Sequence, residues 1–192
     1  MISHWRRAAG DLRRTVVRVN SCPEPALVRT ALVRTALVSL YGAVAAVVRD
    51  DEQAVRLMLA DLEERCAGLD ETLIVISLAT LERLADLPAD DNDGGGHAAR
   101  EVLSIADRFG SSPRRAVESA AWRLDAVRRG DQSGAVRDIL RSRGLASEYD
   151  LARGAVTLLA AVVFRHARLC GCSPRRMATD LCLAASLAAT RR

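Results

Sequence analysis

The sequence contains no lysine, so all 28 of its basic residues are arginines. Such usage is typical of a GC-rich bacterial genome, and an arginine-rich surface is therefore not by itself a sign of nucleic-acid binding. Aromatic residues make up only 3% of the chain, so Leu, Val, Ile and Ala must form the core. Only five prolines are present, at expected helix starts or in a loop. These scarcities favour helices packed closely on helices.

Long hydrophobic runs are also missing. The longest stretch without a charged residue is 35–48, which is 14 residues, whereas a membrane-spanning helix needs about 20. No apolar segment follows the first arginines as it would in a signal peptide. The sequence therefore predicts a cytoplasmic protein without a membrane span. Its five cysteines are then expected to be reduced thiols, most of them small core residues.

The net charge of +4 belongs to one end of the chain. Residues 1–20 hold five arginines and one aspartate, whereas the remaining residues hold equal numbers of arginines and acids. A nucleic-acid-binding domain that is basic throughout would not show this distribution. The arginines at the front lie off an apolar stripe that begins at Trp5, so 1–20 is predicted to be a basic amphipathic helix.

Apolar residues recur at steps of three and four through most of the chain, which is the pattern of amphipathic helices. Clusters of Pro, Gly, Ser and Asp mark the breaks between them. Acidic residues and three successive glycines predict a flexible loop at 88–97. The expected helices are 3–19, 25–48, 52–67, 70–87, 98–108, 113–129, 131–143, 149–169 and 174–189.

The two halves of the chain align loosely. Residues 46–51 match 126–131 at an offset of 80, and 54–56 match 135–137 at an offset of 81. Such internal similarity is typical of a tandem duplication, although chance matching among Ala, Val, Leu and Arg is the alternative. We predict an all-α fold of about nine helices. In it, the basic helix 1–20 precedes two pseudo-repeated four-helix units, 21–110 and 111–192.

Residues suited to catalysis are few. The chain has only three histidines, and it contains no nucleophile elbow, phosphate-binding loop, dinucleotide fingerprint or zinc-protease helix. His166, Cys170 and Cys172 are the one set that could face a metal ion, but the paired Cys-x2-Cys blocks of structural zinc sites are missing. We therefore expect a non-enzymatic protein without a catalytic residue, cofactor or metal.

Two helix starts have nearly the same sequence, Ser-Pro-Arg-Arg, at 112–115 and 173–176. Free backbone amides and arginines at a helix start can hold a phosphate or carboxylate. The alternative is that Arg114 and Arg115 pair with Glu118 and Arg176 pairs with Asp180, as ordinary surface contacts. The candidate residues for nucleic-acid or anion binding are Arg6, Arg7, Arg13, Arg14, Arg18, Arg114, Arg115, Arg175 and Arg176. The apolar segment 181–189 that follows the second start is expected to be buried.

Three classes of function stay open. The first is a regulatory or scaffolding protein that acts through helix-mediated protein contacts, most simply as a homodimer, because the apolar helices at 26–48, 72–87 and 154–169 need covering. The second is a nucleic-acid-binding transcriptional regulator that uses the basic amino-terminal helix or the Ser-Pro-Arg-Arg helix starts. The third is a binder of a small molecule or anion between the two repeats.

Overall fold

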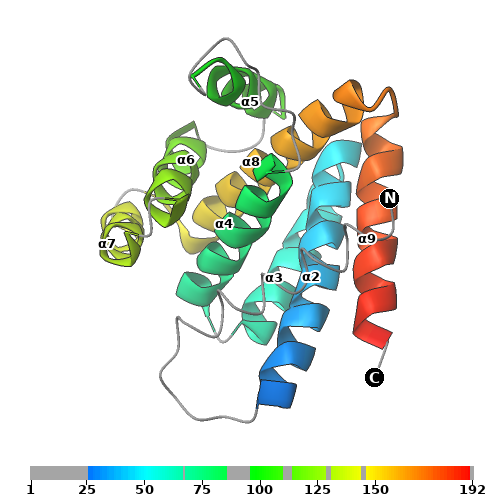
Figure 1. The fold of residues 1–192 in the computed structure, drawn as a ribbon. Helices are drawn as coiled ribbons and strands as arrows, with labels where there is room; N and C mark the ends of the chain where they lie inside the picture. The colour runs from blue at the N-terminus through cyan, green and yellow to red at the C-terminus, as the bar shows by residue number, and fades with distance from the viewer. Residues whose placement is uncertain are drawn as a thin grey trace.

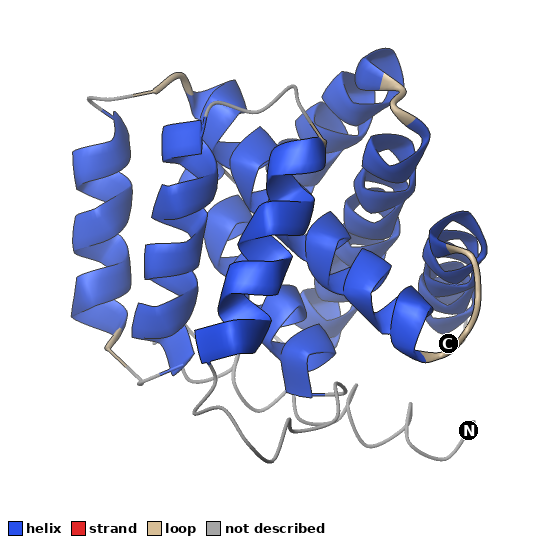
Figure 2. Ribbon diagram, turned by 90° about the horizontal axis from the view of Figure 1, so that it is seen from above, coloured by secondary structure: helices blue, strands red, loops and turns tan. Residues whose placement is uncertain are grey.

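The computed structural model describes residues 26–66, 68–85, 96–109, 114–128, 131–143 and 146–190. Every regular element in these ranges is a helix, and there are eight of them (Figure 2). They are α2 (Ala26–Arg49), α3 (Glu52–Arg65), α4 (Leu69–Ala85), α5 (Gly96–Arg108), α6 (Arg114–Arg128), α7 (Gln132–Arg143), α8 (Glu148–Leu169) and α9 (Pro174–Thr190). The predicted all-α class is confirmed. The predicted helix 1–20, with its five arginines, lies outside the described residues.

The predicted helix bounds agree with these elements to within about two residues. The largest difference in assignment is at the glycine-rich segment, where α5 begins at Gly96, so that the last two residues of the loop predicted at 88–97 belong to a helix. Glycine is tolerated at the first positions of a helix, where its N–H would have no intrahelical acceptor in any case. Residues 86–95 are not described.

Helix α8 lies in the middle of the molecule and contacts each of the other seven described helices. Figure 1 shows it crossing between α2, α3 and α9 on one side and α5, α6 and α7 on the other, with α4 alongside. Of its 22 residues, 15 are buried. A helix that carries apolar side chains on nearly every face must be enclosed in this way, because little of its surface can face water.

Local sequence determines where α8 begins and ends. Ser147 precedes it, and its hydroxyl accepts a hydrogen bond from the backbone N–H of Asp150 at 3.1 Å. Acidic residues occupy the first turn of α8 and basic residues its last, in accordance with the helix dipole. The left-handed Gly171 (φ 66°) then ends the helix and turns the chain into α9.

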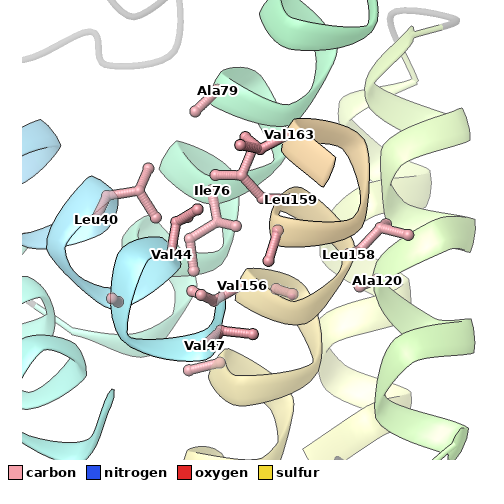
Figure 3. Close-up of a cluster of buried hydrophobic side chains, with 14 of the residues drawn as sticks. Leu40, Val44, Val47, Ile76, Ala79, Ala120, Val156, Leu158, Leu159 and Val163 are labelled. Atoms are coloured by element: carbon pink, nitrogen blue, oxygen red, sulfur yellow. The ribbon is translucent and has the colours of Figure 1, made fainter. Parts of the chain in front are cut away.

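Among the side chains that the structure describes, the core is a single aliphatic cluster to which every helix except α7 contributes several residues, and α7 contributes Ile139. Figure 3 shows Val44 and Val47 of α2 and Ile76 of α4 gathered against Val156 and Leu159 of α8. On the opposite side of α8, Leu158 lies toward Ala120 of α6. The two predicted four-helix units therefore share one core, and α2 of the first packs along α9 of the second.

Among the described residues, no helix alone has the length and hydropathy to cross a membrane, as the sequence predicts. Only α8 and α9 taken together pass that test, and the chain bends by 113° between them.

Gly154 lets α6 approach α8 closely. A Cβ at this position would lie 2.6 Å from the backbone carbonyl carbon of Ala116 and 2.7 Å from its Cβ. Gly42 on α2 provides a matched comparison, because a Cβ there would lie 2.9 Å from Sδ of Met58, an atom in a flexible side chain.

We therefore expect Gly154→Ala to lower the free energy of unfolding by about 1–3 kcal/mol, since backbone must shift to admit the methyl group. Gly42→Ala should leave it unchanged or raise it by up to about 1 kcal/mol, because alanine is the better helix former. Urea denaturation of both variants checks this. Equal effects at the two positions would contradict the close approach of α6 to α8.

Candidate functional site

Polar side chains tie the first two turns of α8 to the start of α3. The Tyr149 hydroxyl donates a hydrogen bond to Glu52 Oε1, and Arg153 Nε donates one to Glu52 Oε2 at 3.2 Å. Arg153 Nη1 also donates to the hydroxyl of Thr157 at 2.5 Å. Arg153 is only 2% exposed, so its charge depends on these partners rather than on water. We call Glu52, Tyr149, Arg153 and Thr157 the α3–α8 tie.

Arg56 completes the surroundings of Tyr149. Its guanidinium carbon lies 4.7 Å from the centre of the Tyr149 ring, and its Nε lies 3.9 Å from Glu52. Burial of the phenol and its hydrogen bond to the Glu52 carboxylate raise the pKa of Tyr149 to about 12. A phenol in this state is a hydrogen-bond donor at neutral pH and not a nucleophile.

A second buried arginine ties the other end of α8 to α5. Arg165 Nε donates to Glu101 Oε2 at 2.7 Å, and the exposed Arg168 reaches the same carboxylate at 3.6 Å. Arg165 is 4% exposed. Two guanidinium groups therefore share one carboxylate at this end of the helix.

The contact between α6 and α7 is polar as well. The Ser119 hydroxyl lies 2.9 Å from Asp138 Oδ2 and 2.6 Å from the Ser142 hydroxyl, while Arg123 Nη2 lies 3.3 Å from Ser119 and 3.7 Å from Asp138. Arg123 is fully buried, and its Nε and Nη1 have no hydrogen-bond partner within the described part of the chain. Burial lowers the pKa of Arg123, and the Asp138 charge opposes that effect.

Each of these three groups joins two helices, and in each a carboxylate or hydroxyl is already engaged by its neighbours. Their chemistry is that of a structural contact, because paired charges satisfy one another when they leave water. No local pattern predicts these pairs, since Glu52 and Arg153, for example, are separated by 101 positions.

The arginines at the two Ser-Pro-Arg-Arg starts are exposed on the surface. Arg114 Nε donates to Glu118 at 2.9 Å and Arg176 lies 3.9 Å from Asp180, which are the pairs with acids expected as the alternative to anion binding. The Ser173 hydroxyl caps α9 by accepting from the Arg176 N–H at 3.2 Å. Anion or nucleic-acid binding by these residues stays a prediction.

A small hollow lies between α5 and α6, beside Arg114. It has a volume of about 250 Å³, including its open mouth, and both apolar and charged residues line it. The lining residues are Leu103, Asp107, Arg114, Val117 and Glu118. Because Arg114 is paired with Glu118 there, the hollow offers a ligand little unpaired positive charge.

His166, Cys170 and Cys172 lie at the end of α8 and in the turn that follows. Over the ranges that the structure describes, no three His, Cys, Asp or Glu side chains are placed so that they could hold a metal ion. The three residues are therefore not carried forward as a metal site.

Large apolar side chains on the surface are the feature that the sequence analysis missed. Segment 181–189 was expected to be buried, but Leu183 and Leu187 of α9 are 58% and 53% exposed. The reason is that Ala178, Leu181 and Ala185 form the face of α9 that packs inward. Four more such residues lie elsewhere, at Leu57, Trp122, Leu140 and Leu169.

No protein-family model, curated protein or solved structure matches this chain. Its function is therefore inferred from its own residues.

The α3–α8 tie generates a prediction for Tyr149→Phe. The variant keeps the ring but loses the hydrogen bond to Glu52, so we expect it to be less stable than wild type by about 1–2 kcal/mol near neutral pH. The phenol of the unfolded chain ionises near pH 10, whereas that of the folded chain does so at about pH 12. The stability that the phenol contributes is thus complete below pH 10 and is lost as the pH rises from 10 to 12.

Urea denaturation of both proteins at about pH 9 and at about pH 11 checks this expectation. The difference in stability should narrow at the higher pH. A difference that stays constant or widens would show that Tyr149 does not donate to Glu52.

Replacing the buried arginines Arg165 and Arg123 by methionine should lower stability by different amounts. Methionine keeps most of the side-chain volume, so the two variants differ mainly in the hydrogen bonds that are lost. Arg165→Met removes a guanidinium bonded to Glu101, whereas Arg123→Met removes one whose Nε and Nη1 lack acceptors among the described residues. We expect Arg165→Met to cost at least about 1 kcal/mol more stability than Arg123→Met. Chemical denaturation measures both, and the reverse order would refute this assignment of their pairing.

Proposed function

We propose that the protein is a non-enzymatic helical scaffold or regulator that acts through protein–protein contacts, with a second copy of the same chain as its partner. The observation that carries the proposal is the exposed pair Leu183 and Leu187. These side chains lie one helical turn apart on the outer face of α9. Large apolar side chains grouped on a surface mark contact sites more often than single ones do.

The position of the pair favours a two-fold contact between copies. In such a contact the same patch is used on both chains, so two α9 helices would lie antiparallel, with Leu183 of one copy beside Leu187 of the other. In the antiparallel arrangement, the positive end of each helix dipole lies beside the negative end of the other, which is favourable. Arg176 and Asp180 continue the outer face toward the start of α9 and would form a polar rim.

The apolar helices that led us to expect an oligomer do not themselves form this surface. From residue 35 onward in α2, and in α4 and α8, the described apolar side chains are largely buried within their own chain. The self-association that we propose therefore rests on α9 and not on those three helices.

The charges of the interior support a structural role. Arg153 and Arg165 donate hydrogen bonds that hold α3 and α5 against α8. An assembly protein needs such a rigid frame, because a surface presented on fixed helices loses less entropy on binding. The described cysteines carry free thiols, which supports our proposal of a reducing, cytoplasmic location.

We also propose that the chain is a tandem duplication in which α2–α5 correspond to α6–α9. The turns aligned at an offset of 80 carry the same hydrogen bonds. Asp51 N–H donates to Ala46 O at 3.0 Å, and Asp131 N–H donates to Ala126 O at 2.9 Å. Each aspartate then caps the next helix by accepting from a backbone N–H three residues on, at 3.0 Å and 2.7 Å. These shared turns support the duplication.

The test is the mass of the particle in solution, measured by light scattering over a range of concentrations. We expect wild type to have twice the mass of one chain, and Leu183→Glu with Leu187→Glu to have the mass of one chain, because buried unpaired carboxylates oppose the contact. Leu57→Glu is the matched control, since Leu57 of α3 is 61% exposed and lies on another helix. It should keep the wild-type mass.

Thermal unfolding of the double variant establishes that it is folded before its mass is interpreted. A wild type that remains a single chain at high concentration would overturn the proposed self-association. So would a folded double variant with the wild-type mass.

A further inference from the structure

Two cysteines flank one glycine in the turn between α8 and α9. Cys170 is exposed, Cys172 is half-buried, and Gly171 between them has φ 66°. A Cβ placed on Gly171 would have no neighbouring atom within 4 Å, so the turn is open on this side. The two cysteines are therefore two positions apart in one turn, and a small reagent can reach that turn from its open side.

The backbone of the turn is held at both ends. Gly171 N–H donates to Arg168 O at 3.1 Å and Cys172 N–H donates to Ala167 O at 3.0 Å, which is the hydrogen-bond pattern of a Schellman motif. Ser173 caps α9 immediately afterwards. The two helices thus fix the reversal in which both cysteines sit.

Chain connectivity keeps the Cα atoms of the two cysteines within the range that a disulfide needs. Two residues that are two positions apart span at most about 7 Å between Cα atoms, and a tight reversal shortens that distance. Disulfides form at Cα separations of about 4.4–6.8 Å. The ring closed by such a bond is small and strained, and strained or exposed disulfides are the ones that reduce most easily.

Arginines lie close to this turn along the chain, and Arg168, Arg175 and Arg176 are exposed. Arg165 and Arg168 share the single carboxylate of Glu101. Arg175 and Arg176 follow the cysteines at the start of α9, and Asp180 lies 3.9 Å from Arg176. A site with more guanidinium groups than carboxylates attracts anionic reagents and raises their rate of encounter.

From these observations we propose that Cys170 and Cys172 form a redox-active dithiol whose substrates are anionic low-molecular-weight disulfides. The Cys170 thiolate attacks one sulfur of the disulfide, so that a mixed disulfide forms and one thiol leaves. The Cys172 thiolate then attacks the Cys170 sulfur, which forms the internal disulfide and releases the second thiol. The two protein thiols are oxidised, the substrate is reduced to two thiols, and each attacking cysteine gives up one proton.

Exposure sets the order of the two steps. Cys170 is the more accessible thiol and meets the substrate, whereas the half-buried Cys172 acts on the sulfur already bound beside it. The left-handed glycine lets the chain fold back between them without strain from a side chain. This activity is independent of the contact proposed for α9, because Leu183 and Leu187 take no part in it.

The experiment treats the reduced full-length protein with a dianionic aromatic disulfide whose released thiolate is coloured, followed by mass spectrometry of the 170–172 peptide. In wild type, this peptide should lose two hydrogens and carry no reagent. In Cys172→Ser, the reagent should remain attached at Cys170, because the second step is impossible. Cys182→Ser removes a thiol that has no neighbouring cysteine in the sequence, and its 170–172 peptide should behave as in wild type.

The charge of the disulfide provides a second readout. We expect the anionic reagent to oxidise the pair about tenfold faster than a cationic diamine disulfide, with a ratio that falls as salt is added. Reagent attached to both cysteines of wild type would overturn the proposal, as would oxidation of Cys172→Ser to the same product. Equal rates with the two reagents would overturn the assignment of anionic substrates.

Discussion

The structure depends on the burial of one helix that carries charge. Helix α8 is enclosed by the seven other described helices, yet Arg153 and Arg165 are among its buried residues. A guanidinium that leaves water needs acceptors close by, since an unpaired buried charge costs several kcal/mol or more. Glu52 at the start of α3 and Glu101 in α5 supply these acceptors. The neighbours of α8 are therefore specified by hydrogen bonds as well as by apolar contact.

This arrangement separates two tasks. Burial of aliphatic side chains drives the helices together. This driving force does not depend on direction, because Leu, Val, Ile and Ala remove apolar surface from water in any close packing. The ion pairs favour this packing over any that would leave the arginines of α8 buried without partners, because an unpaired buried charge is costly. The α6–α7 contact lacks that completeness, since two donors of Arg123 find no acceptor among the described residues. Of the side chains of α7 that the structure describes, only Ile139 belongs to the buried core, and α7 contacts α8 only slightly.

The sequence predicts the helices well because their determinants are local. Helix ends are set within a few residues, by the Asp51 cap, the Ser173 cap and the glycine after α8. The spacing of apolar residues then predicts the helices between these ends. The sequence does not identify α8 as the central helix, because α2 and α4 are more apolar than α8 by composition. It also misses the partner of Arg153, which lies 101 positions away, and the exposure of Leu183 and Leu187. Both depend on which face of each helix turns inward, and that is decided by long-range packing. Of the candidate sites, the surface arginines were found from the sequence, whereas the exposed leucine pair required the fold.

The central position of α8 is tested most directly by native-state amide hydrogen exchange. The most deeply enclosed helix should exchange only when the whole protein unfolds, whereas peripheral helices exchange by local opening. We expect the amides of 151–163 to be the most protected in the molecule, with a free energy of exchange equal to that of global unfolding, and those of α7 to be clearly less protected. If α8 exchanged as fast as α7, the account of a central helix that organises the others would be wrong.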